Sequence, residues 1–152
     1  MTQTTSPPPL ARFGWCCQYI PPDGSIETTR RMNPRTVTVS TLSRLDDVRA
    51  VEKLDQVLRR NLQALHLQLG EVARHPAYRR LLRVNSGLLP VYTHELGRRL
   101  YQEPSIRSLV EAGLDHAGRK AIDAGIRISL HPDQFCVLNS VNESMSKYGR
   151  SG

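Results

Sequence analysis

Apolar residues recur at steps of three and four positions through the middle of the chain. They are Val48, Val51, Leu54, Val57, Leu58, Leu62, Leu65 and Leu69. This spacing places them on one face of a helix, which we predict to end near residues 70–72. Thr41 or Ser43 could cap its start. Asp46 and Asp47 suit its first turn, where carboxylates interact favourably with the helix dipole.

Three short apolar runs lack helical spacing and predict strands, at residues 12–17, 81–84 and 126–130. A second helix is predicted from about Ser105 to Ala124, with Gly125 suited to its C-cap. Its apolar positions are Leu109, Leu114, Ala117 and Ile122. The predicted order is therefore strand, helix, strand, helix, strand.

Strands that alternate with helices indicate an α/β fold in which a parallel sheet is covered by helices. Residues 25–41, rich in Thr, Arg and Ser, are predicted to form a loop, and so are Thr93 to Glu95. The chain has 152 residues. A complete (βα)₈ barrel of the TIM type needs roughly 250 residues, so a barrel here is expected to be incomplete.

The chain divides into three sections by composition. Residues 1–10 are predicted to be a disordered leader, because they are almost all polar or Pro. Residues 11–140 hold the predicted N-terminal part of a barrel. Residues 141–152 have no clear amphipathic pattern and form an atypical tail. A gene fragment, a frameshifted product or a barrel completed by a partner would each account for this organisation.

Basic residues outnumber acidic ones, which gives a net charge of +7 and a pI near 9.8. Such a surface attracts nucleic acid, anionic membranes or acidic proteins, and charge alone does not choose among them. No run of about 20 apolar residues is present, so no membrane span is expected. The three cysteines make a poor disulfide framework, and no secretory signal is visible, so we expect a cytoplasmic protein.

Two histidines lie near the predicted C-terminal ends of strands, where parallel α/β proteins place their reactive groups. His94 is in the loop after the second strand, and His131 ends the third. Imidazoles from two strands, joined by carboxylates, could bind a divalent metal that activates water. The alternative is that both are solvated or packing residues. The spacing of two histidines does not choose between these readings.

The other histidines and the cysteine pair favour structural roles. His66 and His116 lie on predicted helices, where surface or packing roles are expected, and His75 precedes Pro76 in a loop. Cys16 and Cys17 are adjacent in a predicted strand, so their thiols are expected to point to opposite faces. We therefore favour buried thiols over a two-thiol metal ligand.

Gln134 and Phe135 follow the third strand. An amide beside an exposed aromatic ring can fill the gap left by an extruded base and stack there. The alternative, which the residues themselves favour, is that Phe135 belongs to the core.

Several segments, in this order, resemble the UV damage endonucleases, TIM-barrel repair enzymes that nick DNA beside lesions. They are Arg12–Tyr19, Asn61–Leu65, Arg83–Pro90 with His94, and His131–Phe135 with Leu138–Ser140. Each segment alone is weakly specific, but their order and spacing together are fairly specific. The resemblance covers most of the chain.

This resemblance implies a metal-dependent enzyme that acts on double-stranded DNA carrying UV lesions, in nucleotide-excision-type repair. It implies that His94 and His131 bind divalent metal ions, of which Mn²⁺ is expected and Zn²⁺ and Mg²⁺ stay open. Gln134 and Phe135 match the family's Gln-Tyr pair that probes damaged duplex. Trp15 matches an aromatic position near the flipped lesion.

Tyr19 falls loosely where a DNA-contacting residue is expected. The sequence departs from the family's pattern at Asp133, where Gly is frequent, and at Phe135, which lacks the hydroxyl of Tyr. The family's other His, Glu and Asp ligands come from later strands, which this chain does not reach. The catalytic residues therefore stay unassigned.

Three functions remain open. The first is the endonuclease. The second is a non-catalytic, DNA-binding half-barrel, favoured by the absence of a carboxylate-rich strand end after His131. The third is a related barrel enzyme, such as a xylose-isomerase-like sugar isomerase or an abasic-site nuclease. Because half a barrel has open sheet edges, we expect self-association.

Overall fold

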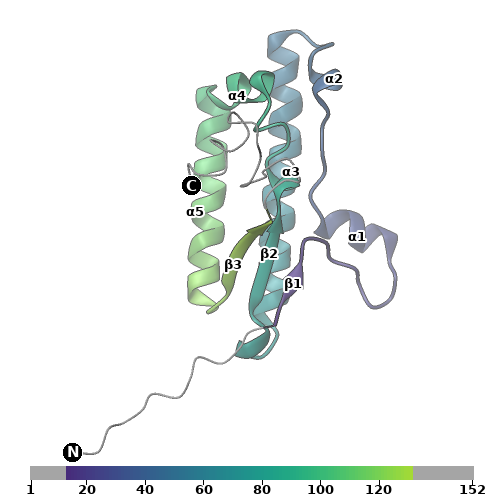
Figure 1. Ribbon diagram of the computed structural model, residues 1–152, viewed down its shortest axis with the longest axis vertical. Coiled ribbons are helices and arrows are strands. Elements are labelled where there is room, and N and C mark those ends of the chain that lie inside the picture. Colours follow the sequence, from purple (N-terminus) through teal and green to yellow (C-terminus); the bar gives the residue numbers. More distant parts are fainter. Residues whose placement is uncertain (1–12, 132–152) are drawn as a thin grey trace, which may run out of the picture.

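The computed structural model describes residues 13–131 of the chain (Figure 1). The elements follow one another as β1 (Trp15–Cys16), α1 (Ile26–Met32), α2 (Val39–Leu42), α3 (Asp47–Ala73), the 3₁₀ turn η1 (Ala77–Arg79), β2 (Leu81–Asn85), the 3₁₀ turn η2 (Ser86–Leu88), α4 (Glu95–Tyr101), α5 (Pro104–Asp123) and β3 (Arg127–His131). The predicted leader, residues 1–10, and the predicted tail, residues 141–152, lie outside the described residues.

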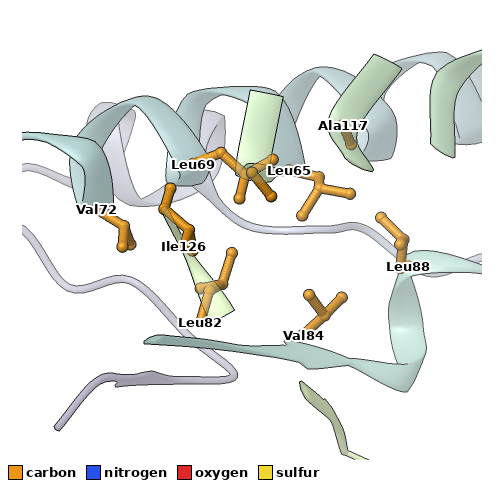
Figure 2. Packing of buried hydrophobic residues seen from close by; sticks show 9 residues of the cluster. Leu65, Leu69, Val72, Leu82, Val84, Leu88, Ala117 and Ile126 are labelled. Carbon is orange, nitrogen blue, oxygen red and sulfur yellow. The ribbon is translucent and has the colours of Figure 1, made fainter. Parts of the chain in front are cut away.

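The strands form a parallel three-stranded sheet in the order β1, β2, β3, which is also their order along the chain. Leu82 of β2 is in register with Trp15 of β1 and with Ile128 of β3. Both long helices, α3 and α5, cover the same face of this sheet (Figures 1 and 2). The α/β class with alternating strands and helices is thus confirmed. Sequential strands with helices on one face are compatible with part of an α/β barrel.

A core between the sheet and the long helices holds the sheet in place (Figure 2). Its buried residues are Leu65, Leu69 and Val72 of α3, Leu82 and Val84 of β2, Ala117 and Ala121 of α5, and Leu88 and Ile126 in the adjoining segments. Complete burial of a Leu or Val side chain stabilises a fold by roughly 1.5–3 kcal/mol. Of the predicted helical face, Leu65 and Leu69 cover the strands, whereas Val48 at the start of the helix is 69% exposed and lies outside both cores.

A second core joins the N-terminal half of α3 to α2, α4 and the start of α5. Leu54 and Leu58 of α3 are fully buried there, against Leu100 of α4 and Ile106 of α5. Arg99 of α4 also forms an ion pair with Asp47 of α3, at 2.7 Å. This second core holds α4 in place beyond the C-terminal ends of the strands (Figure 1).

Residues 25–41 are not one loop, and this prediction was wrong. The segment contains α1 and α2, because Ser25 and Thr38 each accept a backbone hydrogen bond at a helix start, from Thr28 N and Thr41 N. The predicted caps of the long helix were also wrong, since Thr41 lies within α2. Asp46 caps α3 instead, accepting from Arg49 N at 2.9 Å.

Two further predictions need correction. Glu95 is the first residue of α4 and does not belong to a loop. On α5, Leu114 and Ile122 are exposed by 38% and 79%, so neither is part of the core face that the sequence predicted. Ile106, Ala117 and Ala121 are the buried residues of that helix.

No helix between residues 13 and 131 is both long and apolar enough to cross a membrane.

Candidate functional site

The C-terminal ends of the strands form one edge of the sheet, and polar groups gather there. Asn85, the last residue of β2, is in register with His131, the last residue of β3. Two residues before Asn85, Arg83 is in register with both Cys16 of β1 and Ser129 of β3. In parallel pairing, partners in register point to the same face, and these alternate with Leu82 and Val84, which face the helices. The face opposite α3 and α5 therefore carries mostly polar side chains, with Leu81 as an apolar residue at the start of β2.

His94 lies at the start of α4, beyond this edge. It is the N-cap of α4, and its Nδ1 accepts a hydrogen bond from Leu96 N at 3.2 Å. The side chain is exposed, so the other ring nitrogen, Nε2, is the one placed to meet a ligand. An acceptor role for Nδ1 puts the proton of the neutral ring on Nε2.

The backbone around His94 is tightly constrained. Val91 has a φ of 56°, in the left-handed region that β-branched residues rarely adopt. His94 N donates to Val91 O at 3.0 Å. A Cβ added at Gly97 would come within 1.8 Å of Val91 O, so only Gly lets α4 pack this closely against the turn. These contacts fix where the His94 ring can lie.

His131 is half-buried at the end of β3, next to the position of Asn85 in the sheet register. The Asn85 side chain is already used, since its Oδ1 accepts from Gly87 N at 2.7 Å and starts the turn η2. Within residues 13–131 there is no group of three or more His, Cys, Asp or Glu side chains arranged to hold a metal ion. His94 and His131, the predicted metal ligands, are thus not part of such a group in the described part of the chain.

Trp15 and Tyr19, the predicted DNA-contacting aromatics, lie against each other. Their ring centroids are 5.3 Å apart with an interplanar angle of 21°, and the Trp15 ring also lies 5.3 Å from that of His75. Trp15 packs partly against the core that contains Leu82. A cavity of about 10 Å³ beside the two rings is too small for more than one water. Gln134 and Phe135, the other predicted DNA-contacting residues, lie outside the described residues.

An open groove beside Tyr19 was missed by the sequence reasoning. It is lined by Gln18, Thr29, Arg30, Asn33, Pro34 and Arg35. Arg30 and Arg35 are exposed, and the Asn33 side chain ties the groove to β1 by hydrogen bonds with both Tyr19 N and Tyr19 O. The available signal was the run of arginines between residues 30 and 35, in a segment that was predicted to be a loop.

Two buried amides on α3 hold the segments that follow β1 and β2. Asn61 is fully buried, and its Oδ1 accepts from Arg35 N at 2.7 Å while its Nδ2 donates to Arg35 O, Gly87 O and Leu88 O. Gln68 donates to Met32 O at 2.8 Å. Because these bonds satisfy buried backbone groups, Asn61 positions both the Arg35 groove and the turn after β2.

The cysteine pair differs from its prediction. Cys16 is exposed and Cys17 half-buried, and their sulfur atoms lie 3.5 Å apart. The expectation of buried thiols on opposite faces was wrong, because Cys17 has a φ of 61° and leaves the regular strand geometry. The two thiols therefore lie together at the end of β1.

The remaining histidines occupy packing positions, as predicted for them. His66 of α3 stacks on His116 of α5 with centroids 5.0 Å apart, and Lys120 Nζ lies 3.0 Å from His66 Nε2. Burial, with Lys120 and His116 adding positive charge, lowers the pKa of His66. His75 packs against Trp15.

The UV-endonuclease UvdE family model matches residues 11–149, which is most of the chain and includes every element of the structure. The chain belongs to the UvdE family. The resemblance predicted from the four sequence segments is thus confirmed.

Two relatives of this UvdE chain are named UV DNA damage endonuclease. The protein from Halalkalibacterium halodurans is 28% identical over 125 residues, which are 81% of this chain and 37% of the relative. The protein from Deinococcus radiodurans is 30% identical over 129 residues, which are 82% of this chain and 40% of the relative. The UvdE chain therefore spans about two fifths of the length of these relatives.

Proposed function

We propose that this chain acts in DNA repair as a metal-dependent endonuclease that nicks DNA beside UV lesions. Membership of the UvdE family carries the proposal, and the polar edge at the strand ends supports it. This edge is where parallel α/β enzymes hold their reactive groups. The net charge of +7 favours a polyanionic substrate.

His94 and His131 are the proposed metal ligands, with Mn²⁺ as the proposed ion and Zn²⁺ or Mg²⁺ as the alternatives. Such an ion would activate water and stabilise charge on the phosphodiester. His94 would bind through the exposed Nε2, which requires the ring proton to move to Nδ1. Because Nδ1 now accepts from Leu96 N, metal binding and capping of α4 compete at this residue.

Double-stranded DNA with UV lesions is the proposed substrate. Arg30 and Arg35 are placed to contact phosphates, since both are exposed beside the strand ends and offer planar donor groups. Trp15 and Tyr19 form the proposed aromatic contact, and Gln134 and Phe135 the proposed probe of the distorted duplex. The stacking of Trp15 on Tyr19 means that these two rings would act as one surface.

A second candidate is a DNA-binding protein without nuclease activity. It is favoured by one observation, which is that residues 13–131 contain no group of three or more metal-ligating side chains. Metal-assisted phosphodiester cleavage needs a fuller ligand set than two imidazoles. This candidate keeps the same DNA surface and predicts binding without strand cleavage.

The experiment that separates the candidates measures nicking and binding on the same DNA. The purified chain is mixed with UV-irradiated and unirradiated plasmid, with Mn²⁺ or with a chelator, and relaxed plasmid is quantified. We expect Mn²⁺-dependent nicking of irradiated plasmid that is lost in His94→Ala and His131→Ala. His116→Ala is the matched control, because this exposed histidine of α5 stacks on His66 and is not a proposed ligand, so its loss should leave nicking unchanged.

Binding is measured with irradiated duplex at several salt concentrations. Arg30→Ala and Arg35→Ala should each reduce the slope of log K against log salt by about 1, as expected for one lost phosphate contact. Tight, salt-dependent binding without nicking would favour the second candidate. Equal binding of the wild type and both Arg variants would contradict the proposed DNA surface.

A further inference from the structure

Two adjacent thiols stand free at the end of β1, outside the set of residues that the proposed nuclease uses. Cys16 Sγ and Cys17 Sγ lie 3.5 Å apart, close enough for a hydrogen bond between them. In a regular strand, neighbouring side chains point to opposite faces. Here the φ of 61° at Cys17 turns the second thiol toward the first.

The backbone holds this arrangement from both sides. Cys17 N donates to Arg83 O at 2.9 Å, and Gln18 N donates to Cys16 O at 2.6 Å. A left-handed conformation costs a residue other than Gly about 1 kcal/mol or more. The pairing of β1 with β2 keeps Cys17 there, so the folded protein presents the two thiols already close together.

We propose that Cys16 and Cys17 form a dithiol site that chelates a trivalent arsenical, a soft and thiophilic ligand. The ligand needs two sulfur atoms and no further protein group, which is what the described residues supply at this place. Cys16 is exposed and Cys17 half-buried, so the pair is open to a small molecule. The pair would bind this ligand whether or not the chain is a nuclease.

Two other uses of the pair fit the geometry less well. A direct disulfide would have to join Cα atoms only about 3.8 Å apart, whereas disulfides usually join Cα atoms roughly 4.4–6.8 Å apart. A structural zinc ion requires four ligands, and residues 13–131 contain no group of even three suitable side chains. An atom that bridges the two sulfurs avoids both difficulties.

The chemistry balances without an oxidant or a reductant. With phenylarsine oxide, two As–S bonds form and the arsenic–oxygen bond breaks. The two thiol protons leave with that oxygen as water, and arsenic stays trivalent. The pKa of Cys17 is raised, mainly by burial and further by the neighbouring Cys16 thiol, while Arg83 acts in the opposite direction. The raised pKa keeps the Cys17 thiol protonated, which is the form that this condensation consumes.

The test uses the full chain reduced with a phosphine, which introduces no competing thiol, and phenylarsine oxide as the probe. Native mass spectrometry should show one adduct, formed with loss of water, on the wild type and on Cys136→Ser. Cys16→Ser and Cys17→Gly should bind roughly 100-fold more weakly or not at all, because the second thiol acts intramolecularly. Gly tolerates the left-handed conformation, so Cys17→Gly should keep the fold.

Thermal melting supplies a second readout, because a ligand that binds the folded state preferentially stabilises it. At a probe concentration 100-fold above Kd, the wild type should melt roughly 5 °C higher. An adduct that persists in Cys17→Gly, or disappears in Cys136→Ser, would overturn the assignment. An adduct on the wild type without a higher melting temperature would show binding to the unfolded chain and would overturn a preformed site.

Discussion

At the scale of single residues, the turn before α4 is where the chain departs most from local preference. Val91 adopts a left-handed φ although its branched Cβ opposes it, and Gly97 is needed because any Cβ would meet Val91 O. Strain of this kind persists only where the surrounding packing imposes it. Val91 packs partly on the second core, and the turn it makes leads directly into His94.

This strain can be measured by comparing two substitutions that both remove the Val91 side chain. Val91→Gly should be more stable than Val91→Ala by roughly 1 kcal/mol, because only Gly adopts the left-handed region freely. Urea denaturation followed by circular dichroism measures the difference. Ser108 supplies the control pair, since it is exposed within α5, where Gly should instead be less stable than Ala by about 1 kcal/mol. Equal stability of the two Val91 variants would show that the turn is unstrained.

Residue chemistry was predictable from the sequence only where the backbone was regular. His131 lies at the end of β3 as the strand pattern indicated, because regular strands fix which residue comes last. The cysteine pair was mispredicted since one positive φ reverses the direction of a side chain, and no sequence pattern marks such a φ at Cys17. Asn61 was noted only as part of a resemblance, and its bonds to segments 26 and 27 residues away depend on tertiary contacts.

At the scale of elements, length decided what the sequence could predict. The helix α3 has 27 residues and repeats its apolar spacing many times, so its face was clear. The helices α1, α2 and α4 have only four to seven residues, too few for a period to show. The groove of Arg30 and Arg35 was missed for the same reason, because it is built on the end of α1 and the residues just after it.

The contact between α3 and α5 should make stability depend on pH. His66 has a lowered pKa in the folded state, caused first by burial and then by the charges of Lys120 and His116. Its neutral form is therefore favoured by folding. The stability that His66 contributes to the folded state is complete above the ordinary pKa of 6.5. It is lost as the pH falls through the lower pKa of the folded state.

Denaturation between pH 8 and pH 5 tests this sign. The free energy of unfolding of the wild type should fall as the pH drops below about 6.5, and His66→Gln should show a smaller fall. Lys120→Met is the matched variant, since loss of a neighbouring positive charge should bring the pKa of His66 back toward its ordinary value. A His66→Gln variant with the same pH dependence as the wild type would rule out this residue as the cause.

At the scale of the whole molecule, the helical layer covers the described sheet unevenly. Ile128 and Leu130 of β3 are in register with the buried Leu82 and Val84, so they point to the same face. They are nevertheless exposed by 38% and 73%, because in the described part of the chain α3 and α5 are the only long helices on that face. Ile122 of α5 adds a further exposed apolar side chain, at 79%. Exposed apolar groups beside a sheet edge favour association.

We therefore expect the chain to self-associate through this face at micromolar concentration. Sedimentation velocity over a concentration series should show a dimer or larger species for the wild type, and a shift toward monomer for Leu130→Lys, because a buried unpaired charge opposes association. Val48→Lys is the control, since Val48 is 69% exposed at the start of α3, far from β3 along that helix, and should not alter the species observed. A wild-type chain that stays monomeric throughout the series would contradict this expectation. Loss of association in both variants would trace it to net charge and not to the face of β3.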